Sequence, residues 1–319
     1  MRKVVVLSSE SRISYQYEIE ALKQVPDAEF IVSPATEEDD VIDAIRDAEV
    51  VLFTATKINE RVINSLEKCK LIIRYGVGYD NVDLAAAAKR GIFVCNAPNY
   101  GVVDVAEHAL SLILATAKKT VNMHERAHEG LWGPGMPPFY RLAGKTIGFI
   151  GFGHIGRALC KMTNGLSMKP LVYDPYVSDE MVAEYGAVRM SVEQLLEASD
   201  FVSLHLPLNE GTRHFLGKEL LTRMKKTAIL INTSRGAIIN EKELIDVLES
   251  GVIAGAGLDV FEDETKPIDE RLLSNSRVVL TPHVAWNTDV AVTAIHEEVG
   301  DNVVRYLKGE RPMSIVNKI

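Results

Sequence analysis

The sequence predicts an α/β fold made of two parallel-sheet domains. Short runs rich in Val, Ile and Leu alternate with longer amphipathic stretches, which is the pattern of alternating strands and helices. The short runs are nearly continuous in apolar residues, as expected for strands that helices cover on both faces of a sheet. At 319 residues, the chain is also too long for one core of average size. We therefore expect two domains with a cleft between them.

The first alternation ends near Cys95. Its predicted strands are Val4–Leu7, Phe30–Val32, Val50–Phe53, Leu71–Arg74 and Ile92–Val94. Its predicted helices are Tyr15–Gln24, Glu37–Asp47, Asn59–Lys68 and Leu84–Arg90. A turn cluster from Cys95 to Gly101 follows, and a long apolar helix is predicted from Val103 to about Val121.

A second alternation begins after a Gly/Pro-rich loop. Its predicted strands are Thr146–Ile150, Leu171–Tyr173, Phe201–Leu204, Ala228–Asn232, Ile253–Val260 and Val278–Leu280. A last helix, about Val290 to Leu307, is expected to return to the first domain. The predicted domains are thus residues 1–99 plus 288–319, and residues 100–287, with hinges near Pro98–Gly101 and Ala285–Asp289.

The composition argues against several classes of protein, including nucleic-acid-binding and membrane-spanning proteins. The net charge of −9 argues against nucleic-acid binding, because a nucleic-acid surface needs basic residues to neutralise phosphates. No apolar run in the sequence is long enough to span a membrane. The N-terminus resembles a strand more than a signal peptide, and no regulatory extension is expected after residue 319. The three cysteines show no metal-binding or disulfide spacing, so we expect no metal and a cytoplasmic location.

The segment Gly151-Phe-Gly-His-Ile-Gly156 has the spacing of a dinucleotide-binding loop. It follows the predicted strand Thr146–Ile150 and opens a predicted helix, Ile155–Thr163, so a pyrophosphate would lie at a helix N-terminus. The next strand ends at Asp174, whose carboxylate would accept bonds from the ribose hydroxyls and repel a 2′-phosphate. This setting favours a Rossmann-like domain that binds NAD; a glycine turn beside a helix-capping Asp is the alternative.

Polar residues follow three later strands, in the segments Ile231–Gly236, Gly257–Glu264 and Leu280–Trp286. Open α/β sheets bind ligands at the carboxyl ends of their strands. The three segments supply an Arg, several carboxylates and a His. Arg binds a substrate carboxylate in a bidentate manner, His transfers protons near neutral pH, and a carboxylate beside the His orients its ring. These residue types suit hydride transfer to a 2-oxo acid.

The motifs together resemble those of the D-isomer-specific 2-hydroxyacid dehydrogenases over nearly the whole chain. The matching segments are Arg74–Asp83, Val105–His108, the Gly151 loop, His205–Leu208 with Thr212, Asn232–Gly236, Gly257–Glu262 and Thr281–His283. The resemblance implies two domains of Rossmann-like or flavodoxin-like fold, NAD as cofactor, and a small 2-oxo or 2-hydroxy acid as substrate. The branches most similar are those of the C-terminal binding proteins and of phosphoglycerate dehydrogenase.

The resemblance also implies roles for single residues. Arg235 would hold the substrate carboxylate, and His283 would be the acid/base, paired with Glu264. Glu262 is the substitute for Glu264, because Thr265 and Lys266 stand where the family usually has Pro. Asp259 would face the nicotinamide carboxamide. The residues expected to contact NAD are Val77, Gly151, Gly153, His154, Ile155, Gly156, Asp174, Leu206, Pro207, Thr212, Thr233, Ser234, Arg235, Asp259 and His283.

Substrate contacts are expected from both domains. They are Arg74, Val77, Gly78, Arg235 and Trp286. For Arg74 a salt bridge at the strand end is the alternative, and for Trp286 a packing role. We expect His108, His124, His128 and His296 to be structural or exposed, and the Val103 helix to form a homodimer or to be buried within the monomer. Rival functions are an NAD-sensing corepressor-like protein, 3-phosphoglycerate dehydrogenase as the specific activity, and a formate or phosphite dehydrogenase.

Overall fold

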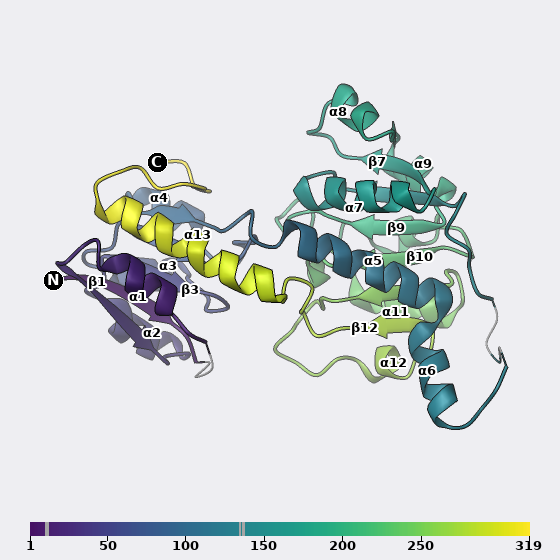
Figure 1. Cartoon of the computed structure of the whole chain (residues 1–319), viewed down its shortest axis with the longest axis horizontal. Helices are drawn as coiled ribbons and strands as arrows, with labels where there is room; N and C mark the ends of the chain where they lie inside the picture. The colour runs from purple at the N-terminus through teal and green to yellow at the C-terminus, as the bar shows by residue number, and fades with distance from the viewer. Residues whose placement is uncertain (10–12, 134, 136–137) are drawn as a thin grey trace. The chain divides into compact units, whose positions relative to one another are not determined.

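The computed structural model describes residues 1–9, 13–133, 135 and 138–319. The chain divides into two compact units (Figure 1). Unit 1 comprises Met1–Gly101 and Thr288–Ile319, and unit 2 comprises Val102–Asn287. Across the described residues, no helix combines the length and the apolar character needed to cross a membrane.

Unit 1 contains a parallel sheet of five strands in the order β2-β1-β3-β4-β5. The strands are β1 (Arg2–Leu7), β2 (Ala28–Ser33), β3 (Val50–Phe53), β4 (Leu71–Arg74) and β5 (Phe93–Cys95). Each neighbouring pair is parallel, and β1 lies between β2 and β3. This is the strand order of flavodoxin-like sheets.

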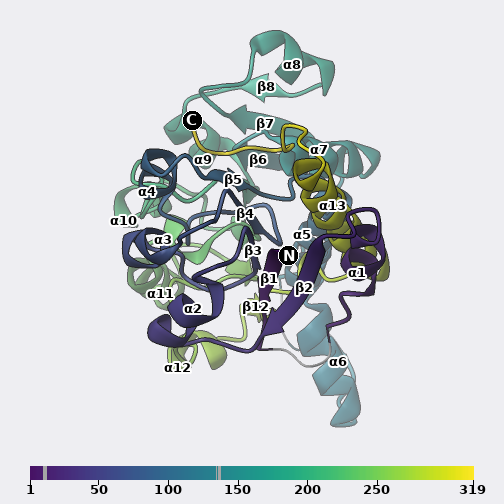
Figure 2. The same cartoon turned by 90° about the vertical axis from the view of Figure 1, so that its left-hand side faces the viewer.

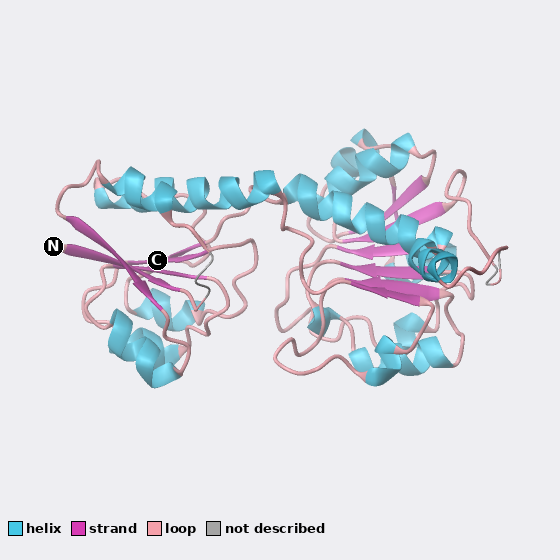
Figure 3. Cartoon of the chain, turned by 60° about the horizontal axis from the view of Figure 1, so that its bottom comes forward, coloured by secondary structure: helices cyan, strands magenta, loops and turns pink. Residues whose placement is uncertain are grey.

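Helices cover both faces of the sheet in unit 1 (Figures 2 and 3). Alternation along β1 sends Val4 and Val6 to one face and Val5 and Leu7 to the other, because successive side chains of a strand point in opposite directions. The helices of the Val4 face are α1 (Gln16–Leu22) and α13 (Asp289–Leu307). Those of the Val5 face are α2 (Glu38–Ile45), α3 (Glu60–Ser65) and α4 (Leu84–Lys89).

Unit 2 contains a parallel sheet of seven strands in the order β12-β11-β10-β9-β6-β7-β8. The strands are β6 (Thr146–Ile150), β7 (Lys169–Tyr173), β8 (Val188–Arg189), β9 (Phe201–Leu204), β10 (Ile229–Asn232), β11 (Gly255–Leu258) and β12 (Val278–Leu280). The chain order reverses between β6 and β9, so the carboxyl end of β6 lies at the switch point where such sheets bind ligands. The expected fold class of two parallel α/β sheets is confirmed.

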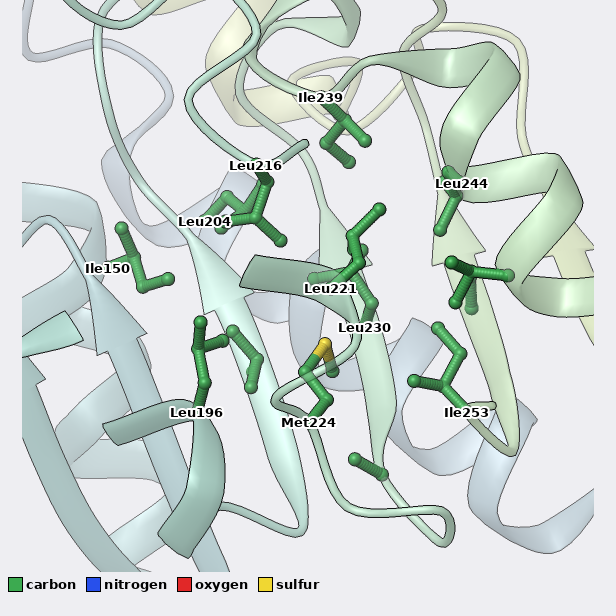
Figure 4. Close-up of a cluster of buried hydrophobic side chains, with 14 of the residues drawn as sticks. Ile150, Leu196, Leu204, Leu216, Leu221, Met224, Leu230, Ile239, Leu244 and Ile253 are labelled. Atoms are coloured by element: carbon green, nitrogen blue, oxygen red, sulfur yellow. The ribbon is translucent and has the colours of Figure 1, made fainter. Parts of the chain in front are cut away.

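The helices of unit 2 also form two layers (Figure 3). One layer is α5 (Val102–Lys118) with α7 (His154–Gly165). The other is α9 (Val192–Ala198), α10 (Lys218–Leu221), α11 (Glu241–Glu249) and α12 (Glu270–Leu273), and the short helix α8 (Asp179–Glu184) precedes β8. Leu204 and Leu230 of the central strands are fully buried against this second layer (Figure 4).

The structure differs from the prediction in one helix and adds one strand that was not predicted. The helix expected from Val103 to Val121 ends at Lys118, and a second helix, α6 (Thr120–His128), begins after a break. Lys119 between them has φ = 51°, the left-handed conformation that interrupts a right-handed helix. Strand β8 is not among the predicted strands, because its two residues, Val188 and Arg189, are too few to show a pattern.

Candidate active site

The glycine loop connects β6 to α7 in unit 2. Gly151 has φ = +90°, and a Cβ atom there would lie 2.4 Å from the carbonyl oxygen of His205. A Cβ on Gly156 would lie 2.9 Å from the carbonyl oxygen of Gly151. Both positions therefore require glycine, since any side chain would collide with backbone. Helix α7 begins at His154 with Gly153 as its N-cap.

The side of the loop that faces away from this backbone has room for a ligand. A Cβ on Gly153 would meet no heavy atom of the described residues within 4 Å. The adjacent N-terminus of α7, a helix of 12 residues, presents backbone N–H groups from His154 and Ile155 that have no partner one turn earlier in the helix. The cradle fits a pyrophosphate.

Asp174, at the end of β7, holds this loop in place. Its Oδ2 accepts a hydrogen bond of 2.7 Å from the N–H of Phe152, and its Oδ1 accepts one of 2.8 Å from the N–H of Tyr176. The side chain is largely buried, with a residue exposure of 9%. Each carboxylate oxygen can accept a second bond, so these contacts leave acceptor capacity for ribose hydroxyls.

The segment after β9 borders the same loop. The hydroxyl of Thr212 donates to the carbonyl of Pro207 at 2.6 Å, which closes the turn that follows Leu206. Burial lowers the pKa of His205 to about 4, so its imidazole is neutral at physiological pH. Its Nε2 lies 2.9 Å from the hydroxyl of Ser203. His205 is therefore part of the partly buried support of the loop.

Arg235 lies in the loop that follows β10. Asn232 shapes this loop, because its Oδ1 accepts from the N–H of Ser234 at 3.0 Å and its Nδ2 donates to the carbonyl of Arg235 at 2.9 Å. A Cβ on Gly236 would lie 1.9 Å from the backbone carbon of Phe261, so glycine permits the close approach of the β10 and β11 loops. The buried hydroxyl oxygen of Thr233 has no hydrogen-bond partner among the described residues.

Glu264 and His283 form a direct pair. Oε2 of Glu264 lies 2.7 Å from Nδ1 of His283, and the two side chains are 40% and 35% exposed. Burial raises the pKa of Glu264, but the hydrogen bond and charge of His283, the N–H of Phe261 and the charge of Arg235 together lower it below its usual value. The loops after β10, β11 and β12 thus bring Arg235, Glu264 and His283 together.

The alternative pairing of His283 with Glu262 is not present. Oε1 of Glu262 lies 2.6 Å from Nε2 of His214, and its Oε2 accepts from the N–H of Glu241 at 3.3 Å. Glu262 therefore contacts a different histidine, and Glu264 is the carboxylate beside His283.

Asp259, the residue expected to face the nicotinamide carboxamide, follows β11. The residue is fully buried. Its Oδ1 accepts from the hydroxyl of Thr281 at 2.6 Å and from the N–H of Val284 at 3.0 Å, and its Oδ2 accepts from the N–H of Ala285 at 3.0 Å. The carboxylate therefore points into the turn that carries His283. Trp286, at the end of this turn, is partly buried.

Arg74, Val77 and Gly78 belong to unit 1: Arg74 is the last residue of β4, and the other two lie in the turn that follows. The Nε of Arg74 donates to the carbonyl of Thr54 at 3.2 Å, and a Cβ on Gly76 would lie 1.9 Å from its guanidinium. The carbonyl of Val77 accepts from Nδ2 of Asn96 at 2.6 Å. The turn is thus anchored to the segment after β5.

Comparison with known proteins agrees with this geometry. The model of the family described as D-isomer specific 2-hydroxyacid dehydrogenase, NAD binding domain, matches residues 110–285. A glyoxylate reductase of Korarchaeum cryptofilum is 39% identical over 283 residues, 87% of this chain and 85% of that protein. A D-3-phosphoglycerate dehydrogenase of Methanocaldococcus jannaschii is 37% identical over 301 residues, 94% of this chain and 57% of that protein.

A solved structure of a D-lactate dehydrogenase from Aquifex aeolicus, complexed with NAD and lactic acid, has a TM-score of 0.87 at 30% identity and covers 96% of both chains. The family resemblance expected from the motifs is confirmed. The chain belongs to the D-isomer specific 2-hydroxyacid dehydrogenase family and is an NAD-dependent enzyme of that family.

Proposed function

We propose that this enzyme interconverts a 2-oxo acid and a D-2-hydroxy acid, with Arg235 binding the substrate carboxylate and His283 with Glu264 transferring the proton. The contact of 2.7 Å between Glu264 and His283 carries the proposal. It lies in the same unit as the glycine loop, and the positive charge of Arg235 acts on Glu264. Carboxylate binding, proton transfer and coenzyme binding are the three functions that the reaction requires.

The coenzyme is proposed to bind along the loops at the carboxyl ends of β6, β7, β9 and β10. His154 and Ile155 would donate backbone N–H groups to the pyrophosphate, and Asp174 would accept from a ribose. Leu206 to Thr212 would border the adenosine, and Thr233 and Ser234 would lie beside the nicotinamide half. The unpartnered hydroxyl of Thr233 supports a ligand contact at that point. When bound, NAD accepts or supplies the hydride.

The geometry of the Glu264–His283 pair indicates which ring nitrogen transfers the proton. Glu264 accepts from Nδ1 of His283, which leaves Nε2 to exchange a proton with the substrate oxygen. In reduction, Nε2 donates to the carbonyl oxygen; in oxidation, it takes the proton of the hydroxyl. The lowered pKa of Glu264 keeps this residue ionised at neutral pH, so it stabilises the protonated ring.

The proposed substrate is a small 2-oxo acid, with glyoxylate as the first candidate. The glyoxylate reductase of K. cryptofilum supports this choice, and 3-phosphoglycerate is the alternative that the M. jannaschii relative suggests. Arg235 would bind the carboxylate in a bidentate manner. Unit 1 is proposed to contribute backbone N–H groups of Val77 and Gly78 and the side chain of Arg74, and Trp286 is proposed to line the substrate pocket.

The direct test is NADH consumption with a panel of glyoxylate, pyruvate and the 2-oxo acid of 3-phosphoglycerate. We expect turnover with at least one of them, because the acid/base pair and the carboxylate-binding Arg are assembled. The decrease of NADH absorbance measures the rate. An enzyme that binds NADH but turns over none of these acids would refute the proposed activity and favour a purely NAD-sensing role.

Replacing Glu264 by Gln should move the alkaline limb of kcat/KM for reduction to lower pH and reduce kcat on the order of 10²-fold. The sign follows from the lowered pKa of Glu264: the carboxylate is ionised across the working range and favours protonated His283. Gln carries no charge and therefore stabilises a protonated ring less than the carboxylate does. The matched control is Glu262→Gln, whose carboxylate contacts His214 instead. Equal pH profiles for the two variants would contradict the role of Glu264.

Replacing Asp174 by Ala should lower the preference for NAD over NADP, because a carboxylate repels a 2′-phosphate. The ratio of kcat/KM for the two coenzymes measures this preference. Because Asp174 also accepts from Phe152 and Tyr176, the Asn variant serves as a comparison that keeps an acceptor and removes the charge. A ratio that stays at the wild-type value in both variants would exclude Asp174 from ribose selection.

We further propose that the enzyme is a homodimer, formed through α5, α6 and the adjoining residues 129–133 of unit 2, in a reducing cytoplasm. No residue of α6 is buried, and Val103, Leu131 and Trp132 are 53%, 47% and 96% exposed. Cys69, Cys95 and Cys160 are free thiols, which supports the reducing compartment.

Light scattering should give twice the chain mass of 35.2 kDa, and Trp132→Glu should shift the protein toward the monomer. The Tyr176→Glu variant is the control, since Tyr176 is 95% exposed on the same unit but outside α5, α6 and residues 129–133. A monomeric wild-type protein would contradict this assembly.

A further inference from the structure

His108 of α5 contacts the polar network beneath the catalytic pair. Its Nε2 lies 2.9 Å from Oγ1 of Thr281 and 3.5 Å from Oδ1 of Asp259. Its side chain is 20% exposed, whereas that of Asp259 is fully buried. Thr281 follows β12 and Asp259 follows β11, so the network joins one helix to the ends of two neighbouring strands.

The direction of these hydrogen bonds can be assigned by counting protons. The hydroxyl of Thr281 has one proton and donates it to Oδ1 of Asp259 at 2.6 Å. Toward His108, the hydroxyl can therefore only accept. Nε2 of His108 must carry a proton and donate it to Thr281. The chain of donors runs from His108 through Thr281 to Asp259.

This chain ends on the carboxylate that shapes the turn of His283. The N–H groups of Val284 and Ala285 both donate to Asp259, and the N–H of His283 donates to the carbonyl of Asp259 at 2.7 Å. His283 itself has φ = 54°, in the left-handed region that only a few per cent of residues other than glycine adopt. The surrounding bonds stabilise this conformation, in which the ring contacts Glu264.

We propose that His108 and Thr281 are positioning residues for the acid/base His283, acting through Asp259. The inference rests on the proposed function of His283. Without the Thr281 hydroxyl, Asp259 loses its shortest bond, and the Nε2–H of His108 loses its nearest acceptor. The turn is then free to relax away from the left-handed conformation of His283, and the contact with Glu264 loosens.

Thr281→Val removes the hydroxyl at nearly constant shape, and Thr281→Ser retains it. We expect Thr281→Val to lower kcat roughly 10- to 100-fold, the effect of misplacing a catalytic group by a fraction of an ångström to an ångström. The alkaline limb of the reduction profile should move to lower pH, as the support of Glu264 weakens. Thr281→Ser should restore both kcat and the limb to near wild-type values, and the Kd for NADH should stay within about twofold.

The His108→Leu and His108→Gln variants repeat the comparison from the other end of the chain, since Gln keeps an N–H donor and Leu has none. If Thr281→Val does not fold, the two His108 variants test the positioning role on their own. A lower melting temperature with unchanged kcat and unchanged limb in Thr281→Val and His108→Leu would overturn the inference, because the chain would then only tie α5 to the sheet. If Glu264→Gln also leaves the alkaline limb at its wild-type pH, the proposed acid/base function of His283 fails. If only the Thr281 and His108 variants leave the limb unmoved, the positioning role of these two residues alone fails.

Discussion

A carboxylate without exposed surface needs hydrogen-bond donors from inside the protein, and Asp259 obtains them from the turn after β12. Two backbone N–H groups and one hydroxyl of that turn converge on its two oxygens. These bonds hold the turn, and within it His283 adopts a left-handed backbone conformation with φ = 54°. The pairing with Glu264, and hence the proposed proton transfer, depends on this constraint.

The proposed coenzyme site of unit 2 also depends on a buried carboxylate that accepts hydrogen bonds from backbone N–H groups. Asp174 accepts from backbone N–H groups in the segments after β6 and β7 and so fixes the glycine loop relative to β7. Glycines then allow backbone segments to touch where side chains would prevent it, as at Gly151 against His205 and at Gly236 against Phe261. Buried acids and close backbone contacts together place flexible loops on a rigid sheet, which is what precise positioning in catalysis requires.

Sequence patterns predict much of this architecture. Strands such as Val50–Phe53 and Phe201–Leu204 are predicted to the residue, because fully buried strands read as short uninterrupted apolar runs. The break at Lys119 escapes prediction, since no glycine or proline marks it. The role of His108 is equally hidden: a lone histidine on a helix gives no sign that a strand end from far along the chain will supply its partner. The choice between Glu262 and Glu264 likewise depends on tertiary geometry, which spacing does not encode.

His283 is the residue proposed to transfer the proton. The most direct test of this role is the His283→Ala variant, with kcat for 2-oxo acid reduction and the dissociation constant of NADH measured on the same preparation. Loss of a general acid predicts a fall in kcat of roughly 10²- to 10⁴-fold while NADH affinity is nearly unchanged. Turnover close to that of the wild type would contradict the account, and so would a large loss of NADH binding, which would make His283 a structural residue.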